Sequence, residues 1–195
     1  MSEQSDEIRV EINQYKILKK VWKKHIFPMW LIVAWLLISL IIFLLRYSSF
    51  CVDFVHIQWL PFSSFIFPGV TGLSFSVTML NATRNLFDIN DLVAMFNFVD
   101  LDDSDINEKG DILYRTLAPY ITASFLWLII SLIAFISSLV NVDFPNIIKE
   151  ILYSIFYSMV IAGLLNLWYL VSVHLKDIFV KVELKINETK GAKKK

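Results

Sequence analysis

Residues 30–45 have the sequence WLIVAWLLISLIIFLL, in which one serine interrupts an otherwise apolar run. Each of four windows lacks Asp, Glu, Lys and Arg and is long enough to cross a bilayer: 25–45, 54–83, 116–142 and 151–175. Because lipid offers the backbone no hydrogen-bond partner, and because these windows do not alternate as barrel strands do, each is expected to be a helix. The predicted fold is an all-α membrane protein with four transmembrane helices, to which the chain termini add short cytoplasmic β-strands.

Basic residues flank this array asymmetrically. Six precede the first window and seven follow the fourth, whereas the two predicted outer loops contain only Arg46 and Lys149 at their edges. Because Lys and Arg next to spans are retained in the cytoplasm, both termini are predicted to be cytoplasmic. Three divisions are expected: an N-terminal strand and basic helix at 1–24, a transmembrane domain at 25–175, and a C-terminal strand and basic tail at 176–195. Within the transmembrane domain, the spans are expected at about 27–45, 57–80, 118–140 and 150–174, and a cytoplasmic loop is expected at 81–116.

The strands are predicted from alternating charged and apolar residues at 7–13 and 179–187. A lone strand leaves its backbone unpaired, so the two are expected to pair beneath the membrane through their apolar side chains: Ile8, Val10, Ile12, Val180, Val182, Leu184 and Ile186. The alternative for the first of them is one amphipathic helix over 8–26. A basic helix from residue 14 is expected to bind anionic lipid headgroups through Lys19, Lys20, Lys23 and Lys24.

The second window contains prolines, glycines and hydroxyl groups. Pro68 is expected to bend or break its helix, because it removes a backbone hydrogen bond. Two interpretations remain open: the segment lines a polar path, or its small residues let another helix approach closely. The candidate residues are Gly69, Thr71, Gly72, Ser74 and Ser76.

The fourth window contains a narrow stripe of small or polar residues spaced four apart: Ser154, Ser158, Ala162 and Asn166. This stripe is expected to face protein, because Asn166 is the most polar group deep in any span and needs a hydrogen-bond partner. A neighbouring hydroxyl or the same residue in another copy would satisfy it. The alternative is a ligand or ion role for Asn166.

The loop between the second and third spans is predicted to contain a short helix that starts at Asp88, with Asp91 three residues on. An acidic run at 100–108 follows. It departs from a calcium-binding loop because Asp105 stands where the tight turn requires glycine, so a solvated or docking surface is expected.

No charged residue lies deep in a window, and no nucleophile with a paired base, phosphate-binding loop or metal-ligand cluster is present. We therefore expect a non-enzymatic protein without a cofactor or direct nucleic-acid binding. Its expected partners are the lipid bilayer, further copies of itself and a cytoplasmic protein.

In size and in its four spans with both ends inside, the chain resembles the membrane subunit of the Kiwa anti-phage system, which is a bacterial inner-membrane oligomer that works with a cytoplasmic DNA-associated effector. The resemblance covers the span layout and assigns no site residue. It implies a scaffold or sensor in the bacterial inner membrane that regulates a cytoplasmic effector. Pore-forming colicin immunity proteins share a similar layout, so an immunity protein and a small pore are the alternative functions.

Overall fold

The computed structural model of the chain describes residues 15–17, 19, 28–48, 58–99, 108–140 and 144–192. These residues form helices and no strand. In chain order the elements are α2 (Met29–Ser48), η1 (Phe62–Phe65), α3 (Ile66–Leu86), α4 (Ile89–Asn97), α5 (Asp111–Leu139) and α6 (Asn146–Ala192). Four helical stretches are long and apolar enough to cross a membrane: Met29–Arg46, Phe62–Leu86, Asp111–Leu139 and Asn146–Glu183. The prediction of an all-α, multi-pass membrane protein is confirmed at this level.

The chain divides into two compact units. The first comprises Met1–Ile26 and Phe87–Ala118, and the second comprises Phe27–Leu86 and Pro119–Lys195. The second unit therefore contains α2, η1, α3, most of α5 and all of α6. Pro119, at which the division falls, lies inside α5.

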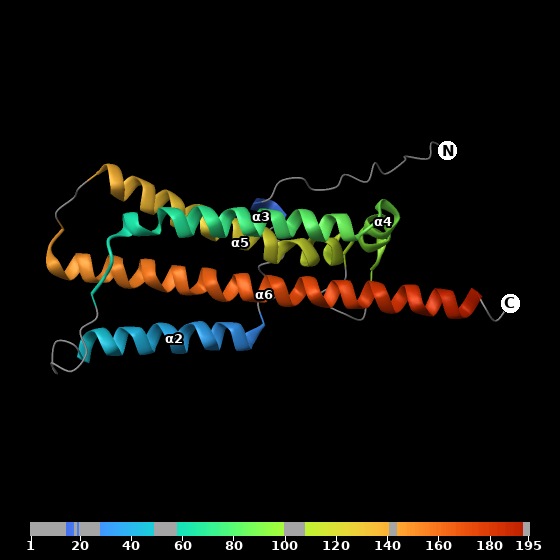
Figure 1. Cartoon of the computed structure of the whole chain (residues 1–195), viewed down its shortest axis with the longest axis horizontal. Coiled ribbons are helices and arrows are strands. Elements are labelled where there is room, and N and C mark those ends of the chain that lie inside the picture. The colour runs from blue at the N-terminus through green and yellow to red at the C-terminus, as the bar shows by residue number, and fades with distance from the viewer. Residues whose placement is uncertain are drawn as a thin grey trace, which may run out of the picture. The chain divides into compact units, whose positions relative to one another are not determined.

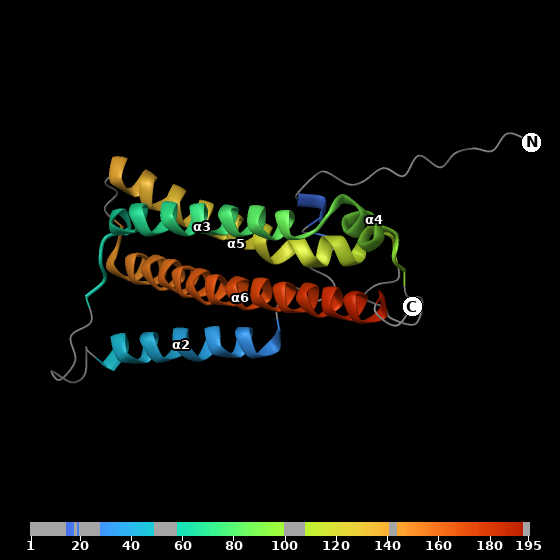
Figure 2. The same cartoon turned by 45° about the vertical axis from the view of Figure 1, so that its right-hand side comes forward.

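In the second unit, α6 packs against both α2 and α3. Two views show α6 running between these two helices (Figures 1 and 2). One buried cluster comprises Trp127, Ile130, Phe156 and Val160, and another comprises Tyr120, Ala123 and Leu170. Helices α5 and α6 each contribute to both clusters, and α6 also contacts α2 and α3, so α6 is a central helix of this unit.

The sequence predicted that Pro68 bends or breaks its helix, and the structure shows no break at this residue. The 3₁₀ turn Phe62–Phe65 leads directly into α3, and Pro68 is the third residue of that helix. The first-turn amides of a helix lack an internal acceptor in any case, so a proline there removes no bond.

The prediction of a strand at 179–187 is wrong, because these residues continue α6, which is 47 residues long. Val180, Val182, Leu184 and Ile186 therefore lie on a helix. Adding residues to an existing helix gains one hydrogen bond each without a new nucleation step, whereas a strand would need a partner. The predicted partner strand, with Ile8, Val10 and Ile12, lies outside the described residues.

In the first unit, residues 15–17 and 19 are helical, as predicted for the basic segment, and Lys19 is exposed. Lys20, Lys23 and Lys24 lie outside the described residues.

The predicted start of α4 is confirmed: the Asp88 amide donates to the Asp91 carboxylate at 3.1 Å. The positive φ of 86° at Gly110 lets the chain turn back, so that the Gly110 amide donates to the Phe96 carbonyl at 2.7 Å.

Candidate functional site

A tryptophan on α5 fills the space between α3 and α6. Trp127 is 1% exposed. A Cβ atom added to Gly72 would lie 2.3 Å from its indole Cδ2, and one added to Gly163 would lie 2.9 Å from Cζ2. Gly69 likewise faces α5, where an added Cβ would lie 2.6 Å from Ser131 Oγ. We call Gly69, Gly72, Trp127 and Gly163 the glycine–tryptophan seam. In it, small residues let helices approach a large aromatic ring.

The predicted polar residues of α3 fall on two different sides of the helix. Ser76 is fully buried and donates to the Gly72 carbonyl at 2.8 Å. Thr71 and Ser74 are exposed, as are Thr78, Asn81 and Asn85. The exposed five alternate three and four residues apart, so they form one stripe, which we call the α3 polar stripe.

The predicted stripe on α6 meets α2 at Ser158. The Trp35 indole donates to the Ser158 carbonyl at 3.0 Å, and the Ser39 and Ser158 hydroxyls are 3.2 Å apart, so Ser158 joins α6 to α2. Ser154 donates to the Glu150 carbonyl at 2.8 Å within its own helix.

Asn166 is 2% exposed, and neither amide atom has a hydrogen-bond partner within the described part of the chain. The buried Trp127 indole nitrogen shares that condition. The partner hydroxyl expected for Asn166 is therefore not found among these residues.

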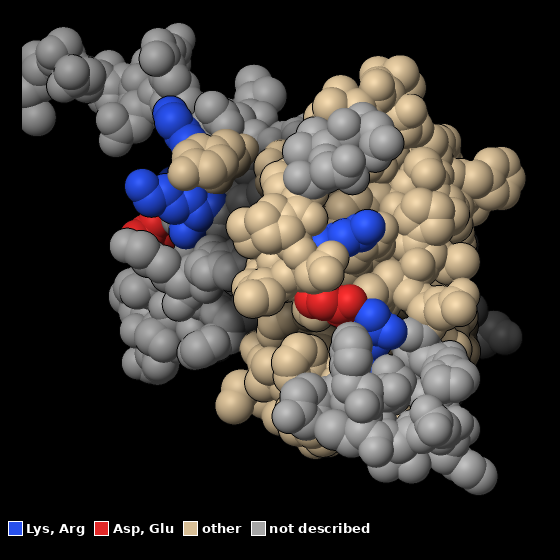
Figure 3. Space-filling model, turned by 90° about the vertical axis from the view of Figure 1, so that its left-hand side faces the viewer, with Lys and Arg blue, Asp and Glu red and all other residues tan. Residues whose placement is uncertain are grey.

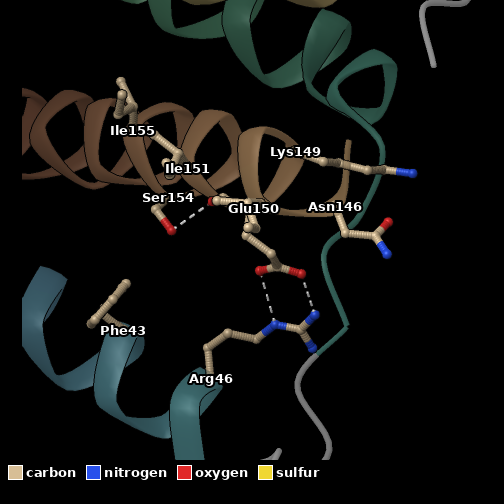
Figure 4. A pocket seen from close by; sticks show the side chains of 9 residues that line it. Phe43, Arg46, Asn146, Lys149, Glu150, Ile151, Ser154 and Ile155 are labelled. Atoms are coloured by element: carbon tan, nitrogen blue, oxygen red, sulfur yellow. Dashed lines mark hydrogen bonds and ion pairs between the residues drawn. The ribbon is translucent and has the colours of Figure 1, made fainter. Parts of the chain in front are cut away.

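An ion pair that the sequence analysis did not anticipate joins the end of α2 to the start of α6. Arg46 Nη2 lies 2.6 Å from Glu150 Oε1, and Arg46 Nε donates to Glu150 Oε2 at 3.3 Å (Figure 4). The Trp59 indole also donates to Oε2 at 2.7 Å, and its ring centroid lies 5.7 Å from Arg46 Cζ. Figure 3 views this end of α2 and α6 and shows acidic and basic side chains in contact among uncharged ones. In the sequence, the signal that could have indicated this ion pair is the presence of opposite charges at the edges of two spans.

A second set of polar contacts joins α6 to the C-terminal end of α3. Thr83 Oγ1 lies 3.0 Å from His174 Nδ1, and the Lys181 ammonium donates to the Leu86 carbonyl in the last turn of α3. A cation in that position satisfies a carbonyl that lacks a partner within the helix and complements the helix dipole. Lys181 thus faces α3.

Across the described ranges, no three His, Cys, Asp or Glu side chains are placed to hold a metal ion. The polar groups that are brought together join helices to one another. No protein-family model, curated protein or solved structure matches the chain.

Proposed function

We propose that this chain is a non-enzymatic scaffold or sensor of the bacterial inner membrane, with both termini cytoplasmic, that oligomerises and regulates a cytoplasmic effector in anti-phage defence. The observation that supports this proposal most is the extension of α6 past the apolar span. At about 1.5 Å per residue, 47 residues reach roughly 70 Å, more than twice the hydrocarbon thickness. The uncharged part ends at residue 175, so the last turns of α6 extend into water.

This extension has an apolar face that no other described helix of the second unit covers. Leu175, Phe179, Val182 and Ile186 are between 48% and 68% exposed. They alternate four and three residues apart and so share one side of α6, which we call the α6 docking stripe. Lys181, which contacts α3, lies on the opposite side of the helix. The α6 docking stripe therefore lies on the segment for which the sequence predicted a β-strand.

Charge favours a partner protein over a second copy of this segment. Between residues 176 and 195, seven lysines stand against three acidic residues. Two copies of such a segment repel each other, whereas an acidic amphipathic helix of a soluble protein is attracted and can bury its apolar face on the stripe.

A photoreactive amino acid at Ile186 tests this proposal in native membranes. We expect a discrete cross-link to a soluble protein with an acidic helix. Phe179→Asp and Val182→Asp should each reduce the yield about tenfold or more, because an unpaired carboxylate in an apolar interface costs several kcal/mol. The same variants should reduce protection against phage in plating assays.

Val180→Asp is the matched control, because Val180 is 47% exposed but lies off the stripe. It should leave both the cross-link and protection unchanged. Cross-links to lipid alone, or to another copy of the chain, would contradict recruitment of an effector.

The α3 polar stripe favours a small pore as a second candidate function. Hydroxyl and amide side chains facing lipid are unfavourable, so this side of α3 is expected to meet other copies. In a ring of copies, Thr71, Ser74 and Thr78 would line a hydrophilic path around the axis.

Ion flux from purified protein in liposomes tests the pore. Thr71→Leu and Ser74→Leu are expected to block flux by at least about tenfold, because a bulky apolar group both narrows and dewets a polar path. Val77→Leu, at a 42% exposed position to one side of the stripe, should leave flux unchanged. Liposomes that leak no more than protein-free ones would reject the pore but not the scaffold.

A further inference from the structure

A groove of about 700 Å³ opens between the end of α2 and the start of α6, beside the Arg46–Glu150 ion pair. Proteins bind single small ligands in spaces of this size. The lining residues that carry the argument are Phe43, Arg46, Lys149, Glu150, Ile151 and Ile155. Because both helices are apolar spans that end here, the groove lies at the membrane interface.

The lining is divided along its length. Asn146 and Lys149 extend toward one end of the groove, whereas Phe43 and Ile155 lie toward the other, with the ion pair between them (Figure 4). Phe43, Ile151 and Ile155 are each more than half exposed, so the apolar part is open to acyl chains. A ligand that matches both parts has a polar head and an apolar chain.

The charge of the polar end favours an anionic head. Both carboxylate oxygens of Glu150 are already engaged by Arg46 and Trp59. Arg46 and Lys149 together exceed Glu150 by one positive charge, and guanidinium groups bind phosphate oxygens in pairs. The N-terminus of α6 adds a partial positive charge at the same end.

We propose that this groove binds one acidic glycerophospholipid. Its phosphate lies against Lys149 and Arg46, and one acyl chain lies along Phe43, Ile151 and Ile155. The bound lipid fills the space between α2 and α6 where the two helices diverge beside the ion pair. This proposal is independent of the effector and of the pore.

Native mass spectrometry after reconstitution in equimolar phosphatidylglycerol and phosphatidylcholine tests the site. Wild-type protein should retain phosphatidylglycerol preferentially. Lys149→Gln should reduce that preference roughly fivefold, the ratio equivalent to about 1 kcal/mol for one lysine near an anionic headgroup. Ile151→Trp should displace the lipid by filling the groove, and excess inorganic phosphate should leave the lipid bound.

Lys176→Gln, at an exposed lysine far along α6, is the matched control and should keep the wild-type preference. Lys149 is itself exposed, so its substitution leaves the packed bundle intact. Equal retention of the two lipids, or a preference insensitive to Lys149→Gln or Ile151→Trp, would overturn the proposal. Release by inorganic phosphate would overturn it as well. So would disulfide bonds between Ile151→Cys copies on a Cys51→Ser background, because a second copy would then occupy the groove.

Discussion

Gly72→Val is expected to destabilise the folded bundle by at least about 3 kcal/mol, the upper end of the usual cost of overpacking. The Cβ atom alone would lie 2.3, 2.5 and 2.7 Å from three atoms of the Trp127 ring. The ring has no room to retreat, because Gly163 on α6 borders its other edge, where an added Cβ would lie 2.9 Å away. Thermal unfolding of the detergent-solubilised protein, followed by size-exclusion chromatography, measures this effect.

Thr71→Val is the control for that experiment, because it places the same residue, valine, at the adjacent, exposed position of the same helix. It should leave the unfolding temperature nearly unchanged. The double variant Gly72→Val/Trp127→Ala should lose less stability than the two single variants lose in sum, because the two residues are coupled by direct contact. If Gly72→Val unfolded at the wild-type temperature, Trp127 would not occupy the space between the glycines.

Asn166→Asp and Asn166→Leu are expected to change stability in opposite directions. The aspartate places a carboxylate at a 2% exposed position deep in a span, which costs about 2.5–3.5 kcal/mol on insertion scales. The leucine removes an amide whose two polar atoms have no partner among the described residues, and so it relieves a desolvation penalty of about 1–3 kcal/mol. Unfolding temperatures in detergent should fall for the first variant and stay level or rise for the second.

The matched control is Leu167→Asn, which adds a second amide at the next position of α6, where the leucine side chain packs against both buried clusters. This variant should be destabilised. If Asn166→Leu were as unstable as Asn166→Asp, the amide would have a hydrogen-bond partner outside the described residues, and the desolvation argument would be wrong.

The sequence predicted the elements of this protein better than their partners. Windows without charge located the four spans, because the cost of placing a charge in lipid depends on each segment alone. The error at 179–187 arose from alternation over nine residues, a pattern that α6 also accommodates by leaving Phe179, Val182 and Ile186 on one face. A preceding helix decides between the two structures, and a local pattern does not contain that information.

For the candidate residues too, the sequence indicated the residues themselves but not what they contact. Gly69, Gly72 and Ser76 were recognisable as small residues in a span, but nothing in the sequence shows that Trp127 packs against the two glycines. Arg46 and Glu150 are separated by 104 positions, and each alone is an ordinary charge at the edge of a span. The structure adds the information that α2 and α6 are neighbours, which places the two charges together.

The amino-acid sequence by itself determined that this chain is helical and crosses a membrane several times, because an unpaired backbone group in hydrocarbon is unfavourable whatever surrounds it. The tertiary structure alone decided which faces of those helices are covered. It buried Gly72 against Trp127, left Thr71 exposed and opened the groove beside Arg46. These outcomes depend on how side chains from distant segments fit one another, since lipid is as apolar as leucine and provides little hydrophobic drive to select one helix face over another.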